Sequence, residues 1–95
     1  MFIINLTYKT ELKNVDKFLN AHIDFLNEQY ELGHFLASGR KIPRTGGIIL
    51  SNVESQSELE KIIGKDPFKK NDLADYNLTE FVPSKTCEEL KFLMK

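Results

Sequence analysis

One histidine is the residue in this chain most suited to acid–base chemistry. On a helical wheel with about 3.6 residues per turn, His22 falls on the same side as the apolar Phe18, Leu19 and Leu26. The charged residues of that segment lie on the opposite side. An imidazole that faces a core needs a partner for each ring nitrogen, and a carboxylate partner suits acid–base work. Asp66, in the run Asp66-Pro67-Phe68, is the best candidate partner.

Each member of this pair also has a purely structural interpretation. A histidine on an apolar face is often a core residue bonded to a backbone carbonyl. An aspartate before a proline is typical of a helix start, because the carboxylate caps the helix and proline takes its first position. Both interpretations of His22 and Asp66 remain open from the sequence.

The segment 37–47 carries a second set of residues that could bind a small molecule. Ser38 and Gly39 could bring a hydroxyl and backbone amides close to a ligand. Arg40 and Arg44 could bind a carboxylate through paired hydrogen bonds. The alternative is a hairpin with solvated charges. The segment lacks the glycine spacing and the Lys-Ser/Thr ending of a phosphate-binding loop.

The composition narrows the classes of function. A net charge of −1 gives no field that would attract nucleic acid, and no apolar run approaches the roughly 20 residues needed to cross a membrane. The polar start of the chain does not resemble a signal peptide. Cys87 is the only cysteine, so no internal disulfide is possible and we expect a cytoplasmic protein. The spacing of histidines and carboxylates favours no metal site, and we expect no cofactor.

Hydrophobic periodicity predicts one small domain over 1–95 with a terminal helical extension over 83–95. Strands are expected at 2–8, 34–41, 45–52 and 74–82. Helices are expected at 14–32, from Ser55 to Gly64, over a short turn at 66–73, and from Thr86 onward. Asn14 is the expected N-cap of the long helix and Gly33 its stop. The pair Gly46-Gly47 predicts a close backbone approach or a bulge.

The order β-α-β-β-α-β with a terminal helix predicts an α+β fold, the ferredoxin-like sandwich. Right-handed crossovers put both main helices on one face of the sheet. The other face is expected to carry apolar residues, with Ile3, Ile49 and Phe81 as candidates. A second subunit would cover such a face, so we expect a homodimer that packs sheet to sheet.

Together these features resemble the YCII-related (YciI-like) family. The resemblance lies in His22, in Gly33 followed by Ala37-Ser38-Gly39, in Gly46-Gly47-Ile48-Ile49, and in Asp66-Pro67-Phe68. It covers about Phe2 to Val82. Where many members read Gly-Pro after the second strand, this chain reads Gly39-Arg40, with its proline at Pro43. The pocket rim therefore differs from that of relatives.

The resemblance implies a dimeric α+β barrel and a His–Asp dyad that carries over to His22 and Asp66. Fold relatives include isomerases and dehalogenases of small ring-derived acids. The resulting hypothesis is an isomerase- or lyase-like enzyme in which His22 and Asp66 are catalytic, while Arg40 or Arg44 holds a small organic acid. The alternative is a dimeric ligand-binding or scaffolding domain. In it, His22 and Asp66 only satisfy each other's hydrogen-bonding groups in the core.

Overall fold

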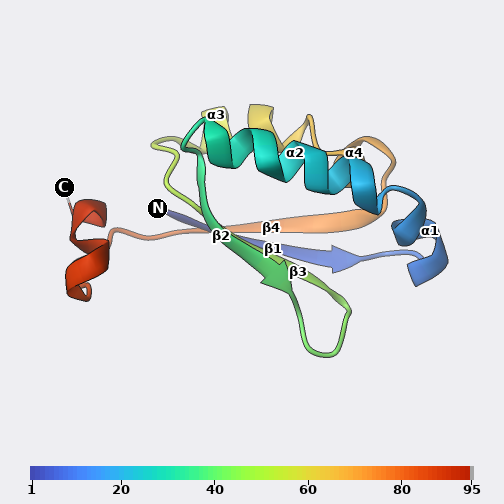
Figure 1. Ribbon diagram of the computed structural model, residues 1–95, viewed down its shortest axis with the longest axis horizontal. Helices are drawn as coiled ribbons and strands as arrows, with labels where there is room; N and C mark the ends of the chain where they lie inside the picture. The colour runs from blue at the N-terminus through green and yellow to red at the C-terminus, as the bar shows by residue number, and fades with distance from the viewer. Residues whose placement is uncertain (95) are drawn as a thin grey trace.

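The computed structural model describes residues 1–94 and confirms the predicted order of strands and helices (Figure 1). The strands are β1 (Phe2–Tyr8), β2 (Phe35–Arg40), β3 (Gly46–Ser51) and β4 (Ala74–Glu80). The helices are α1 (Leu12–Lys17), α2 (Leu19–Glu31), α3 (Gln56–Ile63), α4 (Pro67–Lys70) and the 3₁₀ helix η1 (Glu88–Leu93). This is the ferredoxin-like α+β sandwich.

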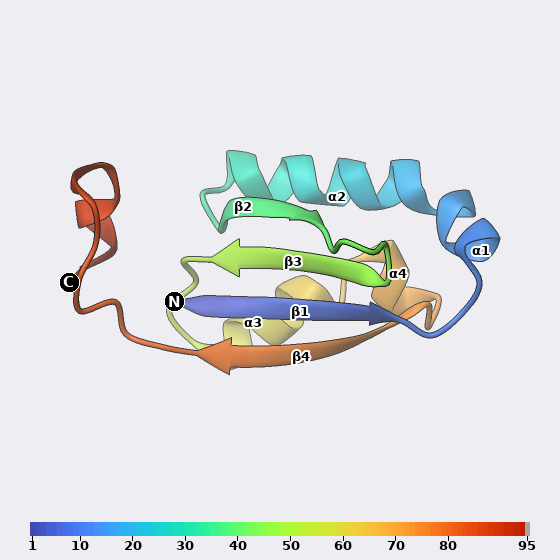
Figure 2. The same cartoon turned by 90° about the horizontal axis from the view of Figure 1, so that it is seen from below.

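The four strands form one sheet in the order β2-β3-β1-β4, and every neighbouring pair is antiparallel. Helices α2, α3 and α4 all lie on the same side of this sheet, as the right-handed crossover rule predicts (Figure 1). The opposite face is seen uncovered from below (Figure 2). None of the helices in residues 1–94 is long and apolar enough to span a membrane.

The core lies between the sheet and the helices, and strict alternation along β1 builds it. Phe2, Ile4 and Leu6 are buried, whereas Ile3 is only half-buried on the uncovered face. The predicted position of Ile49 on the open face is wrong. Ile49 pairs with Ile4 and therefore shares its buried face. A shift of strand register by one residue exchanges the two faces, and the sequence alone did not fix the register of β3.

The predicted long helix is broken at Phe18, which separates α1 from α2. Phe18 has φ −109° and ψ 5°, outside the helical region. Because of this break, the buried face of α2 differs from the face that the helical wheel predicts. Its buried residues are His22, Phe25 and Gln29. Asn14 is not the N-cap, because α1 begins earlier, after Glu11. The predicted stop is confirmed, since Gly33 follows α2 with φ +79°, a conformation that glycine adopts without strain.

Capping side chains start the two helices that follow β3. The hydroxyl of Ser55 accepts a hydrogen bond from the backbone N–H of Glu58, as the capping pattern predicts. Asp66 caps α4 by accepting from the N–H of Phe68, and Pro67 takes the first helical position. These caps fix where α3 and α4 begin. The cap of α4 also places Asp66 and Phe68 next to each other at the start of one short helix.

A close backbone approach at Gly46 explains the paired glycines. A Cβ at Gly46 would lie 1.8 Å from the carbonyl oxygen of Leu6, so no larger residue fits there without a shift of β1 or β3. The bulge lies elsewhere, in β2 between Phe35 and Ala37. The tight contact holds the start of β3 against the centre of the sheet, beside the connection that carries Arg44.

The predicted terminal α-helix is a 3₁₀ helix. It begins after Cys87 rather than at Thr86, and no side chain caps it. An extended segment joins it to β4 and carries it to the end of the sheet near the N-terminus (Figures 1 and 2). Leu93 is buried there, whereas Leu90 and Phe92 are exposed. Lys95, the last residue of the predicted extension, lies outside the described residues.

Candidate active site

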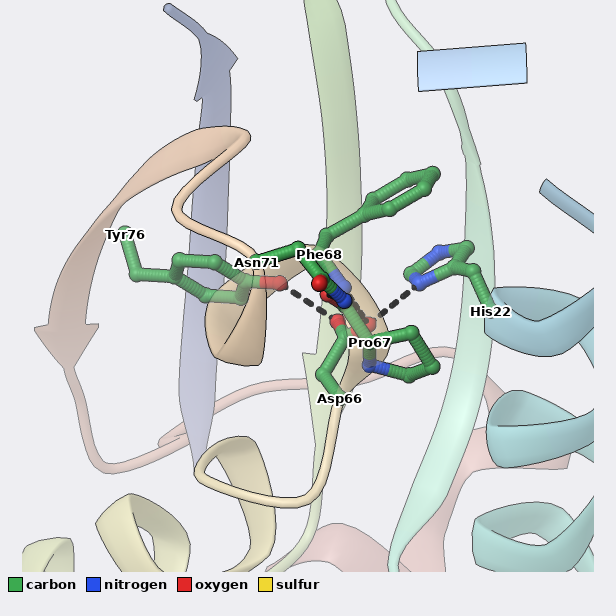
Figure 3. A network of polar contacts seen from close by, with 6 residues as sticks. All are labelled: His22, Asp66, Pro67, Phe68, Asn71 and Tyr76. Atoms are coloured by element: carbon green, nitrogen blue, oxygen red, sulfur yellow. Dashed lines mark hydrogen bonds and ion pairs between the residues drawn. The ribbon is translucent and has the colours of Figure 1, made fainter. Parts of the chain in front are cut away.

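Helix α2 presents His22 to the space between helix and sheet, and α4 holds the ring in place. The side chain of His22 is 11% exposed. The ring of Phe68 stacks on the imidazole, with centroids 4.0 Å apart and planes only 5° from parallel (Figure 3). Such stacking fixes the plane of the imidazole, which leaves its hydrogen bonds to decide how the ring is turned within that plane.

Asp66 supplies the hydrogen bond that the sequence predicted. Its Oδ1 lies 2.7 Å from Nδ1 of His22, and Asp66 is fully buried. The same Oδ1 accepts the N–H of Phe68 at 3.0 Å, which is the capping bond of α4. Capping α4 and bonding His22 are therefore compatible, because one oxygen of Asp66 makes both bonds. Capping the helix is what aims the carboxylate at His22.

The contacts of Asp66 determine which nitrogen of a neutral His22 carries the proton. An ionised carboxylate only accepts hydrogen bonds, so Nδ1 must donate to it. The lone pair of the neutral ring then lies on Nε2. Within residues 1–94 Nε2 has no hydrogen-bond partner, and it is not among the buried polar atoms that lack one. It is therefore reachable from the cavity and able to exchange a proton with a ligand.

Tyr76 is a third member of this network that the sequence analysis missed. Its hydroxyl donates to Oδ2 of Asp66 at 2.5 Å, from strand β4 on the far side of the carboxylate from His22 (Figure 3). Burial, together with the negative charge of Asp66, raises the pKa of Tyr76 far above its ordinary value. The phenol therefore stays protonated. The strand expected at 74–82 contains Tyr76, but nothing in its pattern indicates a contact with Asp66.

A cavity of about 400 Å³ opens in front of the imidazole, between α2 and strands β2 and β3. Its size lies within the range of small-molecule sites, roughly 300–1,000 Å³. Apolar side chains form much of its wall, among them Leu6, Leu19, Ile23, Leu26 and Ile49. His22 lines the cavity, whereas Asp66 does not and acts on it only through the imidazole.

The structure brings all the predicted binding residues to this cavity, but they differ in their partners. Ser38, Gly39, Arg40 and Arg44 line it. The hydroxyl of Ser38 lies 2.6 Å from that of Tyr30, so it is already hydrogen-bonded. The strand register places Ser38 opposite Ile49 and Arg40 opposite Gly47, on the face of the sheet that meets α2.

The two arginines are in different electrostatic states. Nη2 of Arg44 donates to Oδ1 of Asp16 at 2.6 Å, and this bond raises the pKa of the guanidinium. The guanidinium of Arg40 has no ion-pair or hydrogen-bond partner within residues 1–94. Arg40 is thus the cavity cation that a ligand could pair with at no cost to an existing bond. Tyr8, which also lines the cavity beside Arg44, was not predicted.

The donor set at this site does not point to a metal. Across the part of the chain that the structure describes, no three residues among His, Cys, Asp and Glu are grouped so as to hold an ion. The buried carboxylate is also fully engaged by hydrogen-bond donors.

Comparison with known proteins relates this fold to a family and to an enzyme. The family model for the YCII-related domain matches residues 1–82. Among solved structures, the chain resembles 5-chloro-2-hydroxyhydroquinone dehydrochlorinase from Burkholderia phenoliruptrix AC1100 in complex with 2,5-dihydroxybenzoquinone. That likeness has a TM-score of 0.74 at 19% identity and covers 84% of this chain and 91% of the other. A comparison with curated proteins gave no match.

At 19% identity the structural likeness establishes the fold alone. The family assignment rests instead on the family model, which spans β1 to the end of β4 and includes His22, the cavity-lining arginines and Asp66. By that match, this chain belongs to the YCII-related family.

Proposed function

We propose that this protein is a cytoplasmic small-molecule enzyme in which His22 acts as general acid and base on a small anionic substrate. The observation that carries the proposal is the state of the imidazole. Its plane is fixed by Phe68, its Nδ1 is bonded to buried Asp66, and its Nε2 is open to a cavity. The exposed free thiol of Cys87 fits a reducing compartment.

The arrangement suits a reaction that moves one proton at a carbon or hydroxyl group. Nε2 takes the proton, and the imidazolium that forms is stabilised by the carboxylate of Asp66. In an isomerase the same nitrogen returns the proton to another atom of the substrate. In a lyase the electron pair expels a leaving group instead. The dehydrochlorinase of similar fold indicates that this scaffold accommodates the second type.

The substrate class follows from the lining of the cavity. Apolar side chains suit a compact carbon skeleton, and the unpaired Arg40 suits a carboxylate or an ionised ring hydroxyl. We therefore choose 2,5-dihydroxybenzoquinone, which is bound by the protein of similar fold, as the binding probe. Small hydroxylated and halogenated ring acids form the panel for turnover.

Replacing His22 tests the catalytic role. We expect His22→Ala to keep its far-UV circular dichroism but to lose about 10²–10⁴ in turnover of any active panel member, the usual contribution of general acid–base catalysis. His34→Gln is the matched control, because His34 does not line the cavity and bonds Gln29. Rates are measured under saturating substrate for all three proteins.

The alternative, a ligand-binding or scaffolding domain, gives a different result. It predicts that no panel member turns over in the unaltered protein, while His22→Ala lowers the melting temperature under either interpretation, because Asp66 loses a buried hydrogen-bond partner. The absence of turnover would reject the catalytic role of His22.

The arginines provide a matched pair for the binding role. We expect Arg40→Gln to weaken binding of 2,5-dihydroxybenzoquinone by about tenfold or more, the scale of one lost hydrogen bond to a charged group. Arg44→Gln should weaken it less, because Arg44 is already paired with Asp16. Isothermal titration calorimetry of both variants measures this difference. A larger loss in Arg44→Gln would mean that Arg44 exchanges Asp16 for the ligand.

We also propose that two copies of the chain pack through the uncovered face of the sheet. Ile3 and Leu50 are paired neighbours on that face, Ile48 lies two pairs further along on the same face, and all three are half-buried. Because α2, α3 and α4 lie on the other side of the sheet, none of these three helices covers these residues. Apolar strand faces of this kind are common in symmetric dimers.

A charge placed on the uncovered face tests the dimer. We expect the unaltered protein to sediment as a dimer and Leu50→Lys to sediment as a monomer, since an unpaired buried charge is costly. Leu32→Lys is the control, because Leu32 is exposed at the end of α2, on the other side of the sheet. A monomeric unaltered protein, or a dimer in Leu50→Lys, would contradict this interface.

A further inference from the structure

The carboxylate of Asp66 has one oxygen whose hydrogen bonding depends on a single residue. Oδ1 is bonded twice, to the N–H of Phe68 and to Nδ1 of His22. Oδ2 is bonded only to the hydroxyl of Tyr76 among residues 1–94. Because Asp66 is fully buried, water does not replace a missing donor without a change of structure. Tyr76 therefore determines whether this carboxylate is fully satisfied.

The hydroxyl of Tyr76 also limits rotation of the carboxylate. Phe68 and His22 both contact Oδ1, so a turn of the carboxylate about its Cβ–Cγ bond is opposed at that oxygen alone. Tyr76 approaches from β4 on the other side and fixes the second oxygen (Figure 3). With α2, α4 and β4 each providing one member, the orientation of the imidazole depends on α2 and on two consecutive elements, α4 and β4, that lie far from it in sequence.

We infer that Tyr76 is a positioning residue, which fixes Asp66 through Oδ2 and thereby holds His22 with Nε2 toward the cavity. The inference rests on the proposed function of His22, and it adds a residue that does not touch the ligand. Tyr76 is absent from the cavity lining, so it acts on the site only through Asp66. Its influence should therefore appear in the state of the imidazole and in kcat, with little change in KM.

The ring and the hydroxyl of Tyr76 have separable roles. The ring packs against the hydrophobic core and lies beneath the ammonium group of Lys69, 5.4 Å from its centroid. Tyr76→Phe keeps the ring and removes only the bond to Oδ2. A residue with a merely structural role would tolerate this change without any effect on His22.

The test measures the Nδ1 proton of His22 by NMR in protein labelled with ¹⁵N at histidine. In Tyr76→Phe we expect this proton to exchange with water about tenfold faster, the scale of one lost hydrogen bond to a charged group. His34 is an internal reference, because its Nδ1 bonds Gln29 and has no contact with Tyr76. Tyr30→Phe is the matched control, since it removes a phenol hydroxyl that bonds Ser38 instead.

Unchanged exchange at His22 in a folded Tyr76→Phe would overturn the inference and would leave the proposed function standing. Faster exchange without turnover by the unaltered protein would reject the proposed function and keep the positioning role. If Tyr76→Phe does not fold, the hydroxyl proton of Tyr76 is sought in the unaltered protein. We expect it in slow exchange, and a rapidly exchanging hydroxyl would overturn the inference.

Discussion

The carboxylate of Asp66 is the interaction on which the rest of the site depends. It is fully buried and receives hydrogen bonds from α2, α4 and β4. Burying an ionised group is costly unless its oxygens are satisfied, so these donors stabilise the fold as well as orienting the site. The same three bonds that make burial tolerable also define the orientation of His22. The stability of the fold and the proposed chemistry therefore depend on the same hydrogen bonds to Asp66. These bonds leave Nε2 of His22 without a protein partner within residues 1–94, next to the cavity.

Much of the fold could be predicted because its signals are local. Ser55, Asp66 and Gly33 mark helix ends through bonds or conformations that involve only nearby residues. The predictions that were wrong concern features that depend on distant contacts. The face occupied by Ile49 depends on the register between β1 and β3, and the break at Phe18 shifts the phase of the first helix. Both follow from packing against the sheet, which periodicity does not describe.

The same distinction between local signals and distant contacts applies to the candidate site. His22 and Asp66 could be named from residue type and position, and the structure places them in contact. The sequence could not indicate that Tyr76 meets Asp66, because that contact depends on how α4 lies against β4. Nor could it separate Arg40 from Arg44, since the pairing of Arg44 with Asp16 joins segments on opposite sides of α2 in the chain. Partner choice among charged side chains is a property of the folded molecule.

We infer that Asp66 holds neutral His22 with its proton on Nδ1 and its lone pair on Nε2, facing the cavity. The ¹⁵N chemical shifts of the His22 ring, recorded on the ligand-free protein at a pH where the ring is neutral, measure this most directly. We expect a protonated Nδ1 and an unprotonated Nε2. A proton on Nε2, or a ring that averages between the two forms, would contradict it.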